Sequence, residues 1–292
     1  MLTAICTRLG FPKEAIIALN QAYEKLSATG EIAGIWKVAK ERLFRPGDQS
    51  FLELLEKVSQ LTDVHRYTAD MVFLLLSAID VREGYLERGY AESQYWDNME
   101  DLRYKLMECW NRYGIWGTFV TFWYKKFFTV ELFKLGRLQY NKAPFYRDDY
   151  RGIIKKDEPV LTCHIPSSGP LKPEEVLDSL KRAYAFYRDD FKDGIMVLTC
   201  HSWLLYTPQY EVYPENSNLR HFYDMFDVLD FEKRDGYQNF WHIYNRDYDP
   251  EKLNELPTKT GLQRNMLKFV KEGNPMGVGY GVLLFDGEKI IN

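Results

Sequence analysis

Apolar residues recur three and four positions apart through the first 114 residues of the chain. This spacing is repeated in five segments: 12–26, 31–44, 50–61, 63–88 and 93–114. Residues three and four apart share one face of an α-helix, so each segment predicts an amphipathic helix. Gly, Pro, Asp and Ser residues typical of helix ends separate the segments. The first part of the chain is therefore expected to be a bundle of antiparallel helices.

The pattern changes after residue 117. Alternating or short apolar runs typical of strands occupy four segments: 130–140, 157–166, 193–205 and 278–285. Helical spacing returns in three segments between them: 173–191, 216–226 and 260–273. Strands that alternate with helices predict a mixed α/β domain with a central twisted sheet. We therefore predict an α+β protein of two domains, a helical bundle at 1–117 and a mixed domain at 118–292.

One five-residue string, Val-Leu-Thr-Cys-His, occurs twice, at 160–164 and at 197–201. A helix that begins at Pro173 fits between the copies, and strand, helix, strand is the order of a crossover between parallel neighbours. Both copies place their reactive side chains at the carboxyl end, where ligands enter an open α/β sheet. We therefore expect His164 and His201 to lie beside one crevice.

The two Cys-His pairs raise the question of a zinc site. Adjacent residues on a strand face opposite sides of the sheet, so Cys163 and His164 cannot both point at one ion. The same holds for Cys200 and His201, and it also argues against Cys200 as a nucleophile activated by its neighbour. We predict no metal site and interpret both cysteines as small buried hydrophobes. Each histidine is left with two possible roles, catalysis or hydrogen bonds that hold the strands.

The segment after the first copy is a candidate anion site. Ser167, Ser168 and Gly169 can bring backbone N–H groups close to a phosphate, and the following helix adds its positive end. Lys172 adds a positive charge. The alternative is an ordinary turn, because the prolines of this segment each remove a donor.

Composition excludes several classes of partner. The net charge is −4 and basic residues are spread along the chain, which predicts no nucleic-acid partner. The apolar run at 71–79 is about half the length that crosses a bilayer, so it is expected to be a buried helix segment. The N-terminal residues lack a secretion signal and the four cysteines lack paired spacing. We therefore expect a cytoplasmic protein that does not bind membranes.

Several strings in this order resemble a known family. They are WDNMEDLRYKL at 96–106, FFTVELFKLGRLQY at 127–140, HIPSSGPL at 164–171, CHSWLL at 200–205 and GVGYG at 277–281. They are similar to the bacterial two-domain acyltransferase-like family, which joins a helical N-terminal domain to a GNAT-like C-terminal domain. The resemblance spans nearly the whole chain. It implies a GNAT-like fold in which acyl-coenzyme A enters between two diverging parallel strands, with its pyrophosphate on the loop and helix after the first strand.

By this resemblance, the loop that begins with Ser167, Ser168 and Gly169 holds the pyrophosphate. An amine must be neutral to attack a thioester, so a base is required, and histidine titrates in the useful range. His164 or His201 is therefore the candidate base. The residues with supporting roles would be these: Ile165, whose N–H would orient the thioester carbonyl; Ser202, a secondary polar contact; and Tyr223, an acid for the leaving thiolate or a core aromatic.

The expected function is transfer of an acyl group from acetyl-coenzyme A or another acyl-coenzyme A, as co-substrate, to an amine of a small molecule or peptide. The alternative is a GNAT-like module that binds a ligand or partner without catalysis. It stays open because the loop lacks the Gly-x-Gly or Gly-x-Ala that is typical of the superfamily. Arg137 either reaches an anionic group or pairs with a carboxylate across the sheet, and we favour the pair. The acceptor, the acyl chain length and the oligomeric state are not determined by the sequence.

Overall fold

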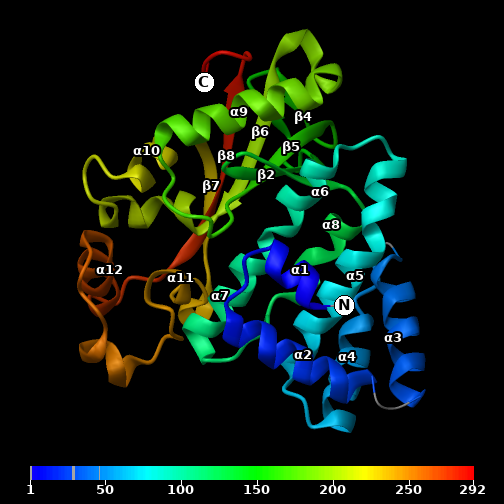
Figure 1. Ribbon diagram of the computed structural model, residues 1–292. Helices are drawn as coiled ribbons and strands as arrows, with labels where there is room; N and C mark the ends of the chain where they lie inside the picture. Colours follow the sequence, from blue (N-terminus) through cyan, green and yellow to red (C-terminus); the bar gives the residue numbers. More distant parts are fainter. Residues whose placement is uncertain (1, 28–29, 46) are drawn as a thin grey trace. The chain divides into compact units, whose positions relative to one another are not determined.

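The computed structural model describes residues 2–27, 30–45 and 47–292, and the chain forms two compact units, Met1–Phe133 and Lys134–Asn292 (Figure 1). Residues 118–133, which the sequence assigned to the second domain, belong to the first unit. The backbone N–H of Thr118 donates to the carbonyl of Tyr67 at 3.0 Å, which ties this segment to a long helix of the first unit.

The first unit is built from helices. They are α1 (Leu2–Arg8), α2 (Lys13–Ser27), α3 (Gly30–Leu43), α4 (Phe51–Thr62), α5 (Arg66–Glu87), α6 (Glu92–Met99), α7 (Asp101–Tyr113), a 3-10 turn η1 (Thr121–Tyr124) and α8 (Lys125–Phe128). The segment 93–114, predicted as one helix, is divided between α6 and α7 at Glu100. The helical character predicted for this part of the chain is confirmed.

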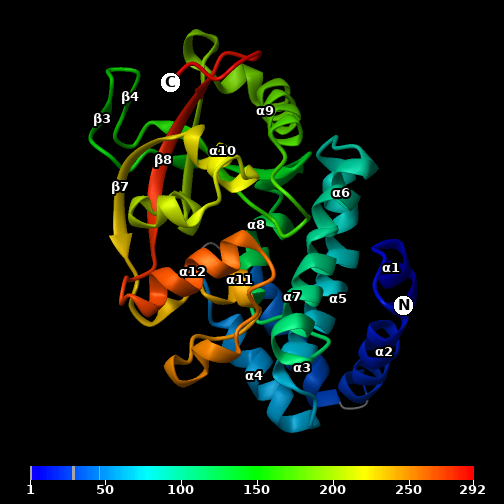
Figure 2. The same ribbon diagram turned by 90° about the vertical axis from the view of Figure 1, so that its left-hand side faces the viewer.

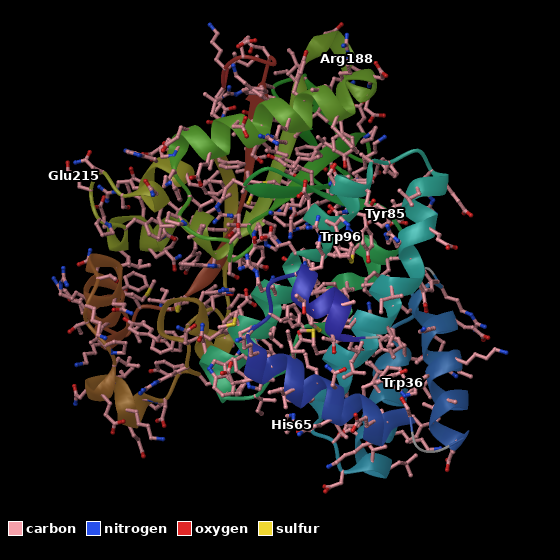
Figure 3. The ribbon with its side chains drawn as sticks, in the orientation of Figure 1. Trp36, His65, Tyr85, Trp96, Arg188 and Glu215 are labelled. Carbon is pink, nitrogen blue, oxygen red and sulfur yellow. The ribbon has the colours of Figure 1, made fainter. Side chains whose placement is uncertain are left out.

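Helix α5 forms the centre of this unit. Its residues 71–75 are all 0% exposed, and α1, α2, α4, α6 and α7 pack against it. The apolar run at 71–79 is thus a buried helix segment, as predicted. Across the residues that the structure describes, we find no helix with both the length and the apolar character needed to span a membrane. The hydroxyl of Tyr85, labelled in Figure 3, donates to the Phe127 carbonyl at 2.7 Å and so joins α5 to α8.

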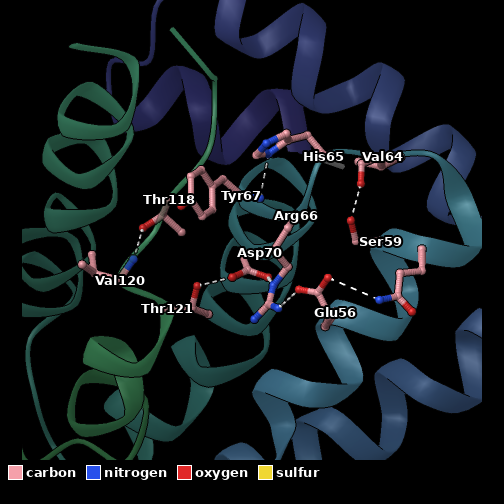
Figure 4. Close-up of polar contacts among 11 residues, drawn as sticks. Glu56, Ser59, Val64, His65, Arg66, Tyr67, Asp70, Thr118, Val120 and Thr121 are labelled. Carbon is pink, nitrogen blue, oxygen red and sulfur yellow. Dashed lines mark hydrogen bonds and ion pairs between the residues drawn. The ribbon is translucent and has the colours of Figure 1, made fainter. Parts of the chain in front are cut away.

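A cluster of side chains around the buried carboxylate of Asp70 joins α4, α5 and the segment before α8 (Figure 4). Asp70 is 3% exposed and accepts hydrogen bonds from Thr121 Oγ1 and from Arg66 Nε, each at 2.6 Å. Arg66 also contacts Glu56 on α4. Burial raises the pKa of Asp70 to about 6, because the loss of hydration outweighs the attraction of the neighbouring guanidinium. The cluster therefore has a structural role in the first unit.

The second unit contains a six-stranded sheet with strand order β1-β2-β5-β6-β8-β7 and a separate hairpin, β3-β4. Its strands are β1 (Leu132–Leu135), which begins at the unit boundary, β2 (Leu138–Pro144), β3 (Asp149–Tyr150), β4 (Ile154–Lys155), β5 (Pro159–His164), β6 (Met196–Ser202), β7 (Asp227–Lys233) and β8 (Gly277–Phe285). Its helices are α9 (Pro173–Tyr187), α10 (Asn218–Asp224), α11 (Trp241–Tyr244) and α12 (Gly261–Lys271). Strands β5 and β6 are parallel, whereas β2 with β5, β6 with β8 and β7 with β8 are antiparallel. The mixed fold predicted for this part is confirmed.

The segment 130–140, predicted as one strand, is a hairpin. Gly136 has φ +77°, a conformation that favours glycine, and it turns β1 back into β2. Alternation of apolar residues continues on both sides of the turn, so periodicity alone did not separate the two strands. Edge strand β7 (Asp227–Lys233) was not predicted, because four of its seven residues are charged and interrupt the apolar pattern that marks the other strands.

The two faces of the sheet are covered differently. Helix α9 lies on one face (Figures 1 and 2), where the Ser179 hydroxyl donates to the Leu135 carbonyl at 2.5 Å and accepts from the Leu138 N–H at 3.0 Å. The β3-β4 hairpin covers part of the other face. A buried cluster joins the hairpin segment to the sheet: Phe145, Tyr150, Ile154, Val160, Tyr280, Val282 and Leu284. The carboxyl end of β6 lies beside this cluster, because His201 is opposite Tyr280 on β8.

Candidate functional site

The two copies of the repeated string pair in register at the centre of the sheet. Among the described residues, β5 and β6 pair at two positions, Leu161 with Leu198 and Thr162 with Thr199. The Thr162 and Thr199 hydroxyls are 2.9 Å apart. Both strands continue beyond this pair but no longer form a ladder with each other. The prediction that the two strands are parallel neighbours is confirmed, and their pairing ends before their carboxyl ends.

Strand alternation places the two histidines together on one face. His164 and His201 each lie two residues beyond the paired threonines, and side chains two residues apart share a face of the sheet. Cys163 and Cys200 therefore face the opposite side and are 2% and 1% exposed. Because the cysteines and histidines are on opposite faces, the two Cys-His pairs do not converge on a common point.

His164 is tied to the neighbouring strand β2. Its Nε2 lies 2.6 Å from Oδ1 of Asn141, which is 1% exposed. The Asn141 Nδ2 donates to the Lys142 carbonyl at 2.8 Å, so the amide presents its oxygen to the imidazole. Nε2 of His164 must then carry a proton and donate it to Asn141. The bond holds β5 to β2, and holding strands together is one of the two roles that the sequence left open for the histidines.

His201 has a different environment. Its side chain is exposed, and its ring lies 6.5 Å from the ring of Tyr280, the residue opposite it on β8. Desolvation by the surrounding protein, followed by the positive charge of Arg234, lowers the pKa of His201 below its ordinary value. The lowered pKa favours the neutral imidazole, which is the form that can accept a proton.

The loop between β5 and α9 presents unpartnered polar groups. Gly169 has φ +125°, a conformation that favours glycine. In the described part of the chain, the backbone N–H groups of Ser168 and Gly169 donate to no protein acceptor, and the buried Ser168 Oγ has no hydrogen-bond partner. Lys172, which precedes α9, pairs with Glu175 at 2.8 Å, and both side chains are exposed. The loop thus offers donors that suit an anion, while the lysine charge is shared with a carboxylate.

Arg137, from the turn between β1 and β2, lies against this loop. Its side chain donates to three loop carbonyls: Nη1 to Pro166 at 3.0 Å, Nη2 to Gly169 at 2.5 Å and Nε to Pro170 at 3.0 Å. The residue is 8% exposed. These partners differ from both possibilities that the sequence suggested, an anion and a carboxylate across the sheet.

Family models cover both units. Residues 1–130 match the model of the N-acyltransferase N-terminal domain, and residues 132–283 match that of the GNAT-like C-terminal domain. The chain belongs to this two-domain N-acyltransferase-like family. The resemblance to a family that joins these two domains, which the sequence strings suggested, is thereby confirmed.

Solved structures share the fold of this family member. An acyltransferase mutant in complex with octanoyl-CoA has a TM-score of 0.69 at 19% identity, over 96% of this chain and 86% of that chain. An acyltransferase in complex with decanoyl-CoA and teicoplanin has a TM-score of 0.63 at 20% identity, over 96% and 98%. A third structure, with CoA and 10C-Teicoplanin, has a TM-score of 0.62 at 19% identity, over 96% and 98%. The search of curated proteins found no match.

Two further predicted residues of the GNAT-like domain have local partners. The Ser202 Oγ accepts from the Leu204 N–H at 3.2 Å and so caps the 3-10 turn η4 (Trp203–Leu205). The Tyr223 hydroxyl, on α10, lies 3.0 Å from Thr207 Oγ1. The catalytic roles assigned to both residues, and the role of the Ile165 N–H, stay predictions.

Polar residues around the histidines were missed by sequence reasoning. Gln139, Asn141 and Thr199 are each 1% exposed, which is unusual for such side chains. Strand register places Gln139 opposite His164 and Asn141 opposite Thr162. The available signal was the alternation of polar residues at 139 and 141 with the apolar residues Leu138 and Tyr140.

The four cysteines of this family member are expected to be unreactive in the folded protein. All are buried, and a hydrogen bond to the Cys200 thiol, followed by burial, raises the pKa of Cys163. Because the thiolate is the reactive form, a disulfide reagent should label the four thiols on unfolding and not before. Counting thiols with 5,5′-dithiobis(2-nitrobenzoate), with and without denaturant, checks this. Fast labelling of Cys200 in the native protein would instead favour a cysteine nucleophile.

Proposed function

We propose that this protein transfers an acyl group from acyl-coenzyme A to the amine of a small-molecule acceptor. The observation that carries the proposal is the end of β5-β6 pairing at Thr162 and Thr199, with two histidines and a donor-rich loop placed just beyond it. Two parallel strands that stop pairing leave their inner backbone groups available to a ligand.

The donor fits the loop after β5. The pyrophosphate of coenzyme A would bind the N–H groups of Ser168 and Gly169 and the Ser168 hydroxyl, which have no protein partner in the described residues. The positive end of α9 would add to this attraction, since the helix begins at Pro173 directly after the loop. Similar structures that contain octanoyl-CoA and decanoyl-CoA support an acyl-coenzyme A donor.

The proposed acceptor is an amine on a small molecule. Two similar structures contain teicoplanin or 10C-Teicoplanin, which supports an acceptor of small-molecule size. A peptide amine is the other acceptor class that the sequence suggested. The free state of the four cysteines supports our proposal that the reaction takes place in the reducing cytoplasm.

His201 is the proposed general base, because its imidazole is exposed and its lowered pKa favours the neutral form that accepts a proton. It would remove the proton from the acceptor amine as the nitrogen attacks the thioester carbonyl carbon. The N–H of Ile165 would orient the thioester carbonyl, and the carbon–sulfur bond would then break. The sulfur would leave as a thiolate that takes up a proton, for which Tyr223 is the proposed donor. Ser202 would hold the η4 turn next to the base rather than take part in proton transfer.

A thermal-shift and turnover experiment tests this proposal. Acetyl-, octanoyl- and decanoyl-coenzyme A are each added to the full chain, with ATP as a control that carries adenine and phosphates but no pantetheine. At a ligand concentration of 100 times Kd, binding stabilises the folded state by about 2.7 kcal/mol, so a clear rise in Tm is expected with at least one thioester. Release of coenzyme A in the presence of an amine panel then measures transfer. No shift with any thioester would contradict the proposal, and a shift without transfer would favour the binding module.

A further inference from the structure

We propose that Arg137 is a positioning residue that shapes the loop of residues 166–171 for the pyrophosphate of the donor. The inference rests on the proposed function and deepens it. It makes binding of the donor's pyrophosphate depend on Arg137, although Arg137 does not contact the pyrophosphate. All three nitrogen atoms of the guanidinium group donate to loop carbonyls, those of Pro166, Gly169 and Pro170. One buried side chain thus holds the loop at three points.

These bonds determine which way the loop peptides face. In a trans peptide the C=O and the following N–H point in opposite directions. With the carbonyls of Pro166 and Pro170 held by Arg137, the N–H groups of Ser167 and Leu171 point away from the guanidinium. Three carbonyl acceptors of the loop therefore face Arg137, while the N–H groups of Ser168 and Gly169 have no protein acceptor in the described residues and are left to a ligand. A surface of N–H groups backed by a buried positive charge favours an anion.

The turn that carries Arg137 is itself fixed between the sheet and α9. Gly136 adopts φ +77°, and a Cβ added to it would lie 3.3 Å from the Cα of Ser179. The Ser179 hydroxyl bonds to backbone groups on both sides of the turn, Leu135 and Leu138. The arginine therefore projects from a rigid support, which is what a positioning role requires.

Lysine cannot replace this arrangement fully. An ammonium group is a single nitrogen, whereas the planar guanidinium presents donors along three directions. Arg137→Lys keeps the charge but can reach only part of the carbonyl set. Arg137→Gln removes the charge and most of the donors. The two variants therefore form a graded series, and the milder one remains informative if the other unfolds.

The test compares two donors, an acyl-coenzyme A and the matching acyl-pantetheine, which lacks the pyrophosphate. KM and kcat are measured for the wild type, Arg137→Gln and Arg137→Lys. Lys181→Gln serves as a control that removes a surface cation from α9, where Lys181 pairs with Glu288. The midpoint of thermal unfolding is recorded for every variant.

In the wild type, acyl-coenzyme A is expected to have a lower KM than acyl-pantetheine. Arg137→Gln should raise KM for acyl-coenzyme A about tenfold or more, as expected for a loss of about 1.4 kcal/mol in binding. KM for acyl-pantetheine and kcat should change little. Arg137→Lys should show an intermediate rise, and Lys181→Gln should match the wild type.

Two results would overturn the inference while leaving the proposed function intact. One is an equal rise of KM for both donors in Arg137→Gln, and the other is an unchanged preference for acyl-coenzyme A. A wild-type protein that turns over neither donor and binds neither in the thermal-shift experiment would instead contradict the proposed function.

Discussion

Replacement of His201 by alanine is expected to lower kcat by roughly 10²- to 10⁴-fold, the usual contribution of a general base. KM for acyl-coenzyme A should change little, because the imidazole acts on the acceptor amine. The side chain is exposed, so its loss should leave the fold intact. Steady-state kinetics on the purified variant measures the effect, with circular dichroism as the check on folding.

The dependence of the rate on pH tests the same prediction, because a histidine with only a structural role would not produce the expected profile. Protonated imidazole cannot accept a proton, so the rate should fall as the pH drops through the pKa of His201. Desolvation and the charge of Arg234 lower that pKa, so the acid limb should lie below the ordinary histidine value of about 6.5. In His201→Ala the residual rate should lose this limb.

His164→Gln is the matched control for the histidine assignment. Glutamine can keep a hydrogen bond to Asn141, so this variant should retain most of the kcat and the acid limb of the profile. A variant series in which His164→Gln loses the limb and His201→Ala keeps it would reverse the assignment of the base.

The central strands could be predicted from the sequence because their signal is local. The two Val-Leu-Thr-Cys-His copies are apolar enough to be buried strands, and Pro173 marks the start of the crossover helix between them. In the structure the two identical strings align in register, with Thr162 beside Thr199. Alternation along the strand then separated the cysteines from the histidines without any three-dimensional information.

The details that distinguish the two histidines could not be predicted, because they depend on residues distant in sequence. His164 meets Asn141 through the β2-β5 register, whereas His201 owes its lowered pKa to desolvation and to Arg234. The target of Arg137 was missed for the same reason. Its three partners lie about thirty residues further along the chain, and one chain position gives no indication of which carbonyl groups surround a guanidinium.

The GVGYG string at 277–281 has a packing role that leads to the second large prediction. Its glycines alternate along β8, and the segment that follows β6 packs against this face of the strand. A Cβ on Gly279 would lie 1.9 Å from the carbonyl oxygen of Leu205, and one on Gly277 would lie 2.4 Å from the Tyr206 ring. Real Cβ atoms do not approach other atoms so closely, so the glycines allow the η4 turn to close on the sheet.

Gly279→Ala is expected to destabilise the second unit by about 3 kcal/mol or more, the upper range for overpacking, because the obstructing atom belongs to the backbone and cannot rotate away. Gly84→Ala in α5 is the matched control: a Cβ there meets nothing within 4 Å, and alanine in a helix should stabilise by about 0.5–1 kcal/mol. Urea denaturation measures both changes. Since η4 directly follows His201 and Ser202, the folded fraction of Gly279→Ala should also lose acyl transfer. A Gly279→Ala protein as stable and as active as the wild type would show that the turn does not depend on this close contact.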